Sequence, residues 1–479
     1  MTPLRIVSDE APAQALIRLA EQVRRDLELL DHAPDWVKPH AAPDGARALD
    51  VAIVGGGQCG LGAAFGLIRD GVRNIVVLDE NDAGLEGPWA TYARMVTLRT
   101  PKHITGLDLG LPSLTFRAWW EAQFGAEGWD ALDKIPKEDW MRYLRWYRET
   151  LNLPVLNRAR VTAILPQPGG LYRLDIEGTP SVWARKVVLA TGIQGGGEWH
   201  TPPLVRALPR ARYAHTSEPI DFAALAGKRV AILGGGASAF DNAQYALGRG
   251  VAEVHVFLRR PELPRVNPIR HMERAGVTRH FASLDDERKY RAIHHFITHS
   301  QPPTNDTFAR AAAYPGFRLH LGSPWTGVRE TEDGVEVTTP KGSFGFDFLV
   351  MSTGLRTDVA LRPELASVAP DIALWRDRYT PPEGAVNPLV DDHPYLGPGF
   401  EFTGRTTDGD EKVRGLFAFN YSALASLGLS ASALSGMKAA LPRLVNGVAR
   451  QLFLDDQDAL LADYIDYAEP EFLGQWPAS

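Results

Sequence analysis

A glycine pattern able to hold a dinucleotide stands near the start of the chain. Gly55, Gly57 and Gly60 form G-x-G-x-x-G between an apolar stretch and a stretch of helix formers. In this pattern the first glycine allows a tight turn, the second lets the backbone approach a pyrophosphate, and the third lets the helix pack on the strand. Asp79 ends the next apolar stretch, where a carboxylate accepts a hydrogen bond from a free ribose 2′-hydroxyl. The alternative is a glycine turn that serves packing alone.

A second pattern, G-x-G-x-x-A, stands in the middle of the chain and consists of Gly234, Gly236 and Ala239. Leu258 occupies the position that corresponds to Asp79, and Arg259 and Arg260 follow it. Two guanidinium groups without a nearby acid favour a ribose 2′-phosphate, because arginine binds phosphate through paired hydrogen bonds. The second site is therefore predicted to bind NADPH rather than NADH. The alternative is a pair of solvated surface arginines.

Two nucleotide sites with opposite ribose preferences indicate a reductant at one site and a resident acceptor at the other. FAD is the natural acceptor, since the first site suits a dinucleotide without a 2′-phosphate. Cys59 lies inside the first glycine turn, where a small buried side chain explains it without a catalytic role. No metal site is expected, because the His294-His295 pair lacks a nearby carboxylate at ligand spacing.

Strand–turn–helix–strand units must position these glycines. Leu49 to Val54 is predicted to be a buried strand, Leu61 to Asp70 a helix and Ile75 to Leu78 the next strand. The same order returns from Arg229, and a similar stretch of short strands follows each unit, over residues 161–192 and 325–354. This self-similarity predicts an α/β protein with two Rossmann-like dinucleotide-binding halves, each with a parallel sheet and a small antiparallel meander.

Composition narrows the classes of partner. The chain has 479 residues, of which 44% are hydrophobic and 23% charged, and a formal charge of −7 without basic blocks. These values predict a protein of two or three domains and give no electrostatic footprint for nucleic acid or a membrane surface. The N-terminus lacks a secretory pattern and a single cysteine excludes an internal disulfide, so a cytoplasmic location is expected. A small-molecule substrate is the favoured partner, and a homo-oligomer is compatible with the sequence.

The fingerprints and the segments around them resemble the class B flavoprotein monooxygenases, which comprise flavin-containing monooxygenases, Baeyer–Villiger monooxygenases and microbial N-hydroxylases. VVLATG ends at Gly192, and DFLVMSTG, which ends at Gly354, is similar to a motif of the N-hydroxylases. MVTLRTP, KEDWMRYLRWYRETL and GLSASALS are also similar to N-hydroxylase segments. The resemblance covers roughly residues 49–455.

The resemblance implies a glutathione-reductase-like FAD domain with an inserted NADPH domain. Residues 1–48 would form an accessory helix and linker, 49–200 together with 341–479 the FAD domain, and 201–340 the NADPH domain. Trp89 and the residues from Gly428 to Ser430 would lie near the flavin. Ser430 would be the N-cap of a helix whose positive end stabilises charge on the reduced flavin, or simply the cap of a structural helix.

The sequence also departs from the family pattern. The fingerprint of flavin-containing and Baeyer–Villiger enzymes is reduced to ARYAHTSEPID, which weakens those two branches. In ornithine and lysine hydroxylases a substrate-binding lysine stands shortly before the V-T-L-R segment, whereas this chain has Ala93, with Arg94 beside it. This difference weakens the expectation of an amino-acid substrate held in the same way and leaves open whether the substrate is an amino acid.

The reaction implied by the resemblance is monooxygenation of a small molecule. NADPH would reduce FAD, and a flavin (hydro)peroxide would place one atom of O2 on the substrate, with N-hydroxylation of an amine as the favoured outcome. S-oxygenation, Baeyer–Villiger oxidation, an uncoupled NADPH oxidase and a flavin-dependent reductase stay open. Asn267 and Asn305 lie in segments similar to N-hydroxylase stretches that face NADP and substrate, and with Arg94 they are the catalytic candidates. Each asparagine has the alternative of capping a turn.

Overall fold

The first sheet of the fold carries the first glycine turn. The computed structural model describes residues 12–30, 33–104, 106–431 and 433–476. The strand order is β3-β2-β1-β6-β5-β4, with β17 beside β6. These strands are β1 (Leu49–Val54), β2 (Ile75–Leu78), β3 (Val155–Leu156), β4 (Val161–Gln167), β5 (Leu171–Ile176), β6 (Thr179–Leu189) and β17 (Leu416–Phe417). β1, β2, β3, β6 and β17 pair in parallel, while β4, β5 and β6 form the predicted antiparallel meander.

Helix α2 (Gln58–Arg69) follows β1 and begins three residues before the predicted Leu61, directly after Gly57. It packs against α15 (Leu434–Asp455), because Gly62 and Gly66 leave room for apolar side chains of that helix. A Cβ at Gly66 would stand 2.6 Å from a methyl group of Val445. Residues about 380 positions apart in sequence thus hold the first nucleotide-binding helix in place.

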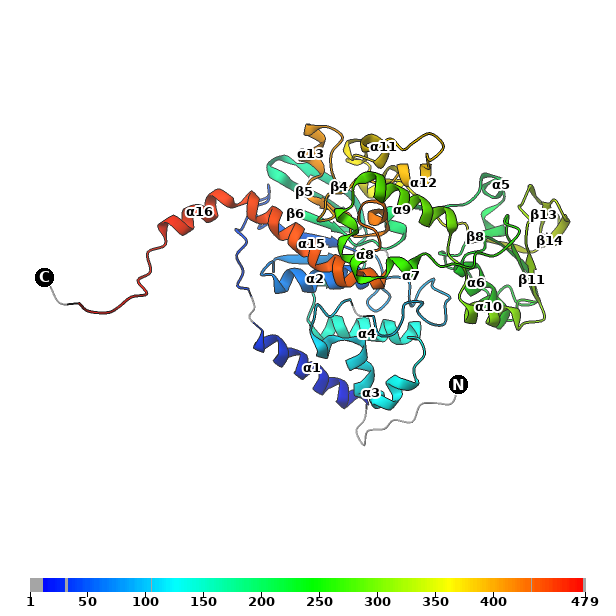
Figure 1. The fold of residues 1–479 in the computed structure, drawn as a ribbon, viewed down its shortest axis with the longest axis horizontal. Coiled ribbons are helices and arrows are strands. Elements are labelled where there is room, and N and C mark those ends of the chain that lie inside the picture. The colour runs from blue at the N-terminus through cyan, green and yellow to red at the C-terminus, as the bar shows by residue number, and fades with distance from the viewer. Residues whose placement is uncertain (1–11, 31–32, 105, 432, 477–479) are drawn as a thin grey trace.

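A second sheet repeats the plan in a separate lobe, on the right of Figure 1. Its order is β11-β10-β9-β15-β8, with every pairing parallel. The strands are β8 (Tyr213–His215), β9 (Arg229–Leu233), β10 (Glu253–Phe257), β11 (Phe317–His320) and β15 (Phe348–Met351). Helix α6 (Ala237–Gly248) joins β9 to β10, and β12 (Gly327–Glu330), β13 (Val335–Thr339) and β14 (Gly342–Phe346) form the second meander. Both predicted Rossmann-like halves are confirmed.

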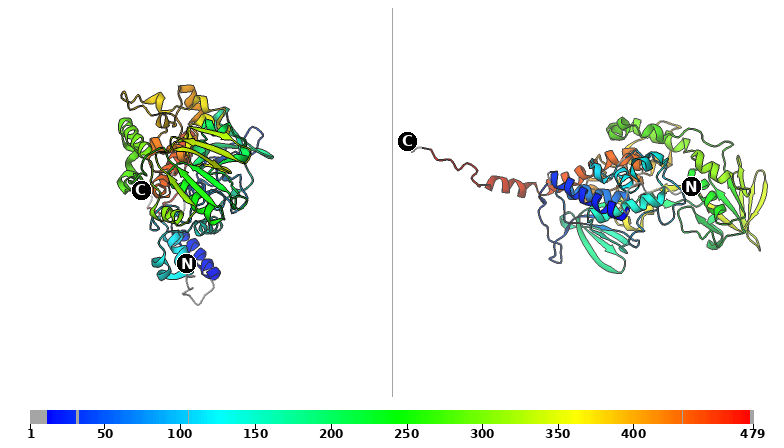
Figure 2. Two further views of the ribbon diagram at one scale, coloured as in Figure 1. Left: turned by 90° about the vertical axis from the view of Figure 1, so that its right-hand side faces the viewer. Right: turned by 90° about the horizontal axis from the view of Figure 1, so that it is seen from below.

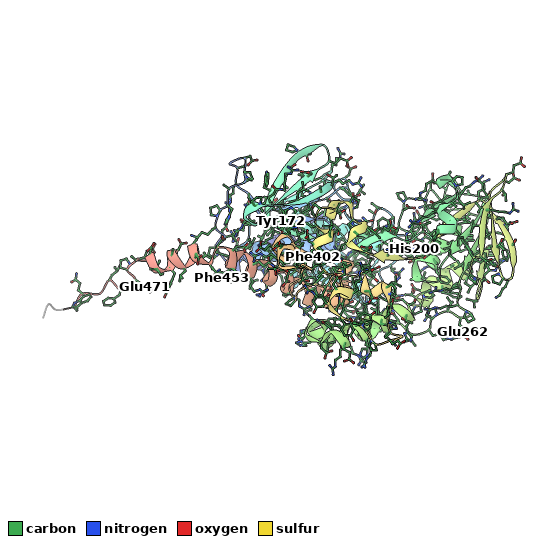
Figure 3. The ribbon with its side chains drawn as sticks, turned by 90° about the horizontal axis from the view of Figure 1, so that it is seen from above. Tyr172, His200, Glu262, Phe402, Phe453 and Glu471 are labelled. Carbon is green, nitrogen blue, oxygen red and sulfur yellow. The ribbon has the colours of Figure 1, made fainter. Side chains whose placement is uncertain are left out.

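The predicted domain boundary at residue 341 is wrong in its position. β14 and β15 belong to the second lobe, so the chain returns to the first lobe only after Met351. The two crossings run side by side, because β7 (Gly197–Trp199) pairs with β16 (Leu355–Thr357). Figure 3 places His200, next to β7, between the two lobes. The boundary was misplaced because β15 belongs to the second sheet through its pairing with β9, which is far away in the sequence.

Not all residues of the predicted NADPH domain pack in the second lobe. Helices α7 (Ile269–Met272), α8 (Ala275–His280) and α9 (Asp286–His299) leave the second sheet after β10 and return at α10 (Asn305–Ala312). Their apolar residues, among them Phe281 and Ile293, pack in one cluster with Trp375 and Leu424 of the first lobe. This helical excursion packs on the first lobe, where α8 contacts α15, and α9 lies above and to the right of α15 in Figure 1.

Helices α1 (Pro12–Leu29), α3 (Phe116–Ala131) and α4 (Lys137–Thr150) form a layer at the bottom of Figure 1. α1 is the predicted accessory helix and it contacts α3. Phe116 lies at the centre of an aromatic cluster within 6.4 Å of the rings of Trp119, Trp120, Trp129, Trp140 and Tyr143. No helix of the described residues is long and apolar enough to cross a membrane.

The C-terminal end projects from the first lobe as an arm (Figures 1 and 2). It begins with α16 (Gln457–Asp466), and Figure 3 shows Phe453, near the end of α15, at its base and Glu471 further along it. The base of the arm is fixed by the buried Asp456, which accepts two hydrogen bonds of 2.9 Å from Arg185 and one of 2.8 Å from His40. A bidentate pair of this kind sets the direction in which the arm leaves the body.

Asp50, near the start of β1, predicts a measurable pH dependence of stability. Its carboxylate is fully buried and accepts no hydrogen bond from the described residues. Burial raises the pKa of Asp50 to about 6, against the opposing charges of Arg47 and Arg185. Since the unfolded value is about 3.9, the folded state binds a proton that the unfolded chain has lost, and stability falls as pH rises from about 4 to about 6.

Asp50→Asn is therefore expected to raise the thermal midpoint at neutral pH and to flatten its pH dependence over that interval. Differential scanning fluorimetry across the interval measures both effects. A midpoint that is unchanged at neutral pH, with the same slope as wild type, would contradict the assignment.

Candidate active site

The three glycines of the first turn have different surroundings. At Gly55 φ is +105°, and a Cβ would stand 2.5 Å from the carbonyl oxygen of Ala190. At Gly60 a Cβ would stand 1.8 Å from the carbonyl oxygen of Gly55. Gly57, in contrast, has an ordinary extended backbone, and a Cβ there would meet only backbone atoms of Gly87, at 3.7 Å or more. The first and third glycines are thus required by packing, whereas the second leaves open space at the N-terminus of α2.

Asp79 lies at the end of β2, as predicted, and is 5% exposed. Its Oδ2 accepts a hydrogen bond of 2.7 Å from the amide of Gly56 in the glycine turn, and its Oδ1 accepts one of 2.8 Å from the amide of Asn81. A carboxylate has about four acceptor positions, so it retains capacity for a ribose hydroxyl. The loop that follows brings Trp89 near Gly87, with a buried indole N–H that has no partner among the described residues.

The second turn has the same backbone geometry, but an apolar side chain stands where the first turn has a carboxylate. Gly234 has φ of +129°, and a Cβ there would stand 2.1 Å from the carbonyl oxygen of Ser352. Gly236 has nothing within 4 Å of an ideal Cβ. A Cβ at Gly235, the counterpart of Gly56, would stand 2.0 Å from the Leu258 side chain, which fills the place that Asp79 takes in the first lobe. The second turn therefore has no carboxylate for a ribose 2′-hydroxyl.

The two Thr-Gly segments lie beside the fingerprints. Ala190 and Thr191, which precede Gly192, abut Gly55, just as Ser352, two residues before Gly354, abuts Gly234. Gly192 and Gly354 both have positive φ, of 69° and 80°, with open space beside them. The structure thus gathers the predicted Thr-Gly glycines at the carboxyl ends of the two sheets, where open α/β sheets bind their ligands.

The two candidate arginines have different roles. Arg260 donates to the carbonyl oxygens of Thr298 and His299, at 2.6 and 3.0 Å, and so ties down the end of α9. Arg259 is exposed and makes no interaction with any described residue. Arg259 is therefore the guanidinium that is available to a ligand.

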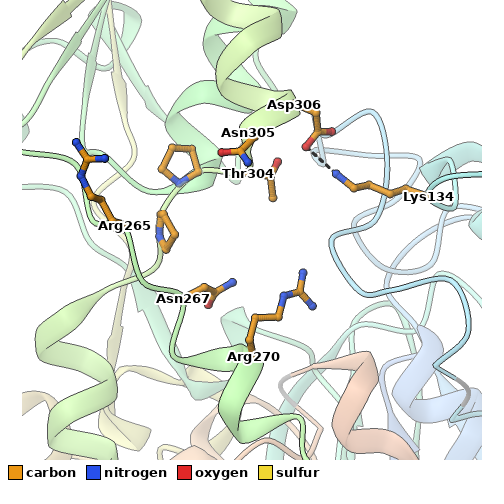
Figure 4. A pocket seen from close by; sticks show the side chains of 9 residues that line it. Lys134, Arg265, Asn267, Arg270, Thr304, Asn305 and Asp306 are labelled. Carbon is orange, nitrogen blue, oxygen red and sulfur yellow. Dashed lines mark hydrogen bonds and ion pairs between the residues drawn. The ribbon is translucent and has the colours of Figure 1, made fainter.

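A cleft of about 390 Å³ lies between the second lobe and a loop of the first (Figure 4). Its lining is formed by Lys134, Arg265, Asn267, Arg270, Pro302, Pro303, Thr304, Asn305 and Asp306. The predicted candidates Asn267 and Asn305 thus lie on one cleft, although they come from opposite ends of the helical excursion. Sequence reasoning missed Lys134, Arg265 and Arg270, although Arg270 stands in the same motif as Asn267.

The cleft is suited to an anion. Burial alone would raise the pKa of Asp306, but hydrogen bonds from Lys134, Thr304 and Arg310 lower it well below its ordinary value, so this carboxylate is neutralised by its neighbours. Asn267 uses its Oδ1 to accept a hydrogen bond of 3.1 Å from the amide of Ile269, as the turn-capping alternative anticipated. Its NH2 group is left to donate. Asn305 is the first residue of α10, whose positive end faces the cleft.

Two expectations fail at this site. Ser430 is not an N-cap: α15 begins at Leu434 after Ala433, and the Ser430 hydroxyl donates to the carbonyl oxygen of Gly428 at 3.3 Å. Gly428 is buried against Phe281 of the helical excursion. Arg94 does not line the cleft, because its guanidinium is buried and bonded to backbone carbonyl groups of the second lobe.

Comparison with known proteins places the chain in a family. The pyridine nucleotide-disulphide oxidoreductase family matches residues 52–274. The chain is 59% identical over 466 residues to an FAD-dependent urate hydroxylase of Xanthomonas campestris pv. campestris, covering 97% of this chain and 98% of the relative. This chain belongs to the class B flavoprotein monooxygenases.

Solved structures agree with this assignment at the level of the fold. Ornithine hydroxylase of Pseudomonas aeruginosa has a TM-score of 0.67 at 17% identity, with 85% of this chain and all 100% of that chain covered. Cadaverine monooxygenase of Erwinia amylovora has a TM-score of 0.61 at 16% identity, with 90% and 99% covered. As a class B monooxygenase, the enzyme is an oxidoreductase. The urate hydroxylase is FAD-dependent, and an ornithine N-hydroxylase of Kutzneria sp. 744 was solved with reduced FAD and NADP⁺, at a TM-score of 0.66 and 17% identity, with 84% of this chain and 99% of that chain covered.

The two glycine turns fit these cofactors. The open space beside Gly57, with Asp79 and Trp89 close by, suits the pyrophosphate, ribose and ring system of FAD. The open space beside Gly236, with Arg259 beyond the end of β10, suits the pyrophosphate and 2′-phosphate of NADPH. In this monooxygenase the cleft that holds Asn267 lies between the lobe of the NADPH turn and a loop of the first lobe.

Arg259→Ala is expected to lower the preference of the monooxygenase for NADPH over NADH. A charge-assisted contact to phosphate contributes about 1.5–3 kcal/mol, so the ratio of the two kcat/KM values should fall by about tenfold to a hundredfold. Arg260→Ala should instead lower the thermal midpoint, since it releases the end of α9. Steady-state kinetics with both nucleotides tests the assignment, and an unchanged ratio in Arg259→Ala would place the 2′-phosphate elsewhere.

Proposed function

We propose that this enzyme hydroxylates urate with NADPH and O2 as co-substrates. The observation that carries the proposal is the 59% identity, over almost the whole of both chains, to an FAD-dependent urate hydroxylase. One oxygen atom of O2 enters urate, the other leaves as water, and NADPH supplies two electrons and becomes NADP⁺. FAD, when bound, supplies the activation of O2 that no side chain provides.

The cleft supports an anionic heterocyclic substrate. Urate is a planar anion at neutral pH that carries carbonyl and N–H groups around its rim. Arg265 and the N-terminus of α10 offer positive charge, and the Asn267 NH2 group offers a donor to a ring carbonyl. Arg270 also lines the cleft, where its charge is paired with Glu273 at 2.9 Å. Closing a substrate into this space between the lobes also removes water from it.

Amine N-hydroxylation is the second candidate, because the MVTLRTP and GLSASALS segments resemble those of N-hydroxylases. The position shortly before MVTLRTP is Ala93, so the lysine that holds amino-acid substrates in that branch is missing. The structure of the cleft therefore favours a substrate held by arginine and amide groups over an amino acid held by lysine.

A substrate panel separates the candidates. The FAD-loaded enzyme is given NADPH with urate, ornithine, lysine, a diamine, a sulfide or a ketone, and substrate loss and NADPH oxidation are followed together. We expect urate alone to be consumed in amounts equal to the NADPH oxidised. Stoichiometric hydroxylamine formation from an amine, with urate untouched, would replace urate hydroxylation by N-hydroxylation.

A further inference from the structure

One segment of the first lobe reaches across to the helix that carries the second glycine turn. This segment, residues 94–99, is named the clamp segment here. Its backbone is held by the first lobe, because the amide of Leu98 donates to the carbonyl oxygen of Ile135 at 2.8 Å and the amide of Lys137 donates to that of Val96 at 3.2 Å. The Leu98 side chain is buried. The segment is therefore attached to the first lobe.

Arg94 at one end of the clamp segment is bonded to the second lobe. Its guanidinium donates to the carbonyl oxygens of Thr216 and Glu218, at 2.7 and 2.8 Å, and lies 5.2 Å from the centre of the Phe222 ring. Arg94 is buried, with 8% of the residue exposed. Burial lowers the pKa of Arg94 to about 10, so the group stays charged at neutral pH. A buried guanidinium satisfied by carbonyl groups of another lobe is a directional tie between the two.

Arg99 at the other end holds α6 itself. Its guanidinium forms an ion pair with the carboxylate of Asp241, whose side chain is 5% exposed. Gln244, one turn further along α6, donates through Nε2 to the carbonyl oxygen of Arg94 at 3.1 Å. Arg99 and the backbone of the clamp segment thus contact one face of α6, and the Arg94 side chain contacts the connection between β8 and β9.

We propose that the clamp segment positions the NADPH site relative to the FAD site, with Arg94 and Arg99 as positioning residues. α6 begins at Ala237, directly after Gly236, so a movement of α6 against the first lobe moves the bound pyrophosphate with it. Misplacement of reacting groups by about 1 Å can cost about a hundredfold in rate. The inference depends on the two cofactors and is independent of the identity of the substrate.

The test compares Arg94→Met and the double variant Arg99→Met/Asp241→Asn with wild type, all loaded with FAD. The double variant removes both charges, which avoids the cost of a buried unpaired carboxylate. Arg329→Met, which breaks an exposed ion pair with Glu336 in the second meander, is the matched control. Two quantities are measured: the anaerobic rate of flavin reduction at saturating NADPH, and amide hydrogen exchange over residues 213–222 and 237–248 without NADPH.

We expect flavin reduction to be about tenfold to a hundredfold slower in both clamp variants. The NADPH concentration that gives half the maximal rate should change by less than about threefold. We also expect faster exchange in both segments, with FAD content retained and Arg329→Met unchanged. Arg94→Lys should recover part of the rate, since one ammonium group reaches fewer carbonyl groups. Reduction rates within about twofold of wild type, unchanged exchange, or a rate loss that simply follows loss of FAD would each overturn the proposal.

Discussion

Gly57→Val is expected to give a folded protein that no longer retains FAD. The backbone at Gly57 is extended and the space beside it is open, so the fold accepts a β-branched side chain there. The same space is where the pyrophosphate must approach the backbone. We expect FAD occupancy to fall by more than about tenfold and monooxygenase activity by more than about a hundredfold, because O2 activation resides in the cofactor. Absorbance of the purified protein and FAD released on denaturation measure the effect.

Two matched glycine variants make this result specific. Gly236→Val introduces the same side chain at the open position of the second turn. This variant should retain FAD and have a higher KM for NADPH. Gly60→Ala should instead fail to fold well, since its Cβ would collide with the carbonyl oxygen of Gly55. If Gly57→Val keeps full FAD content, the pyrophosphate does not lie at this turn.

Asn267→Asp is expected to lower kcat/KM for urate by about tenfold to a hundredfold, mainly through KM. The turn survives, because a carboxylate oxygen still accepts the hydrogen bond from the amide of Ile269. The NH2 donor is replaced by a negative charge that faces an anion, and loss of one charged or polar contact costs about 1.5–3 kcal/mol. Steady-state kinetics with urate at saturating NADPH measures the change.

Asn387→Asp is the control for this prediction. Asn387 also precedes a proline and accepts a hydrogen bond of 3.1 Å from the amide two residues on, but it lies outside the cleft. Its substitution should leave the urate kinetics within about twofold of wild type. An effect of Asn267→Asp on the KM for NADPH, with that for urate unchanged, would assign the cleft to the nicotinamide nucleotide.

The sequence predicted the parts of this fold that depend on local pattern. The bounds of β1 and β2 match the prediction because both are apolar runs that end at a turn residue. The strand β15 was assigned to the wrong lobe, since sheet membership depends on pairing with β9, which is over 110 residues away in the sequence. The helical excursion was missed for the same reason, because its apolar residues pack on the first lobe rather than on their sequence neighbours.

The site residues that belong to one short motif could be predicted from the sequence. The glycine turns, Asp79 and Leu258 needed only spacing, and the structure gives each turn the surroundings that its motif implies. Asn267 and Asn305 came from a resemblance, and the cleft brings them together. Arg94 was a catalytic candidate because it stands next to the position of the substrate-binding lysine in related enzymes. In the structure it instead donates a hydrogen bond to the second lobe, and the sequence alone does not distinguish these two roles. The Arg99–Asp241 pair had no signal in the sequence, since its members are 142 positions apart.

We propose that this class B monooxygenase places one atom of O2 on urate. The direct measurement is the stoichiometry of NADPH, O2 and urate consumed by the FAD-loaded enzyme, with ¹⁸O2 as the oxygen source. We expect equal amounts of the three, one ¹⁸O atom in each molecule of hydroxylated product and little hydrogen peroxide. Hydrogen peroxide equal to the NADPH consumed, with urate unchanged and no ¹⁸O in any product, would contradict it.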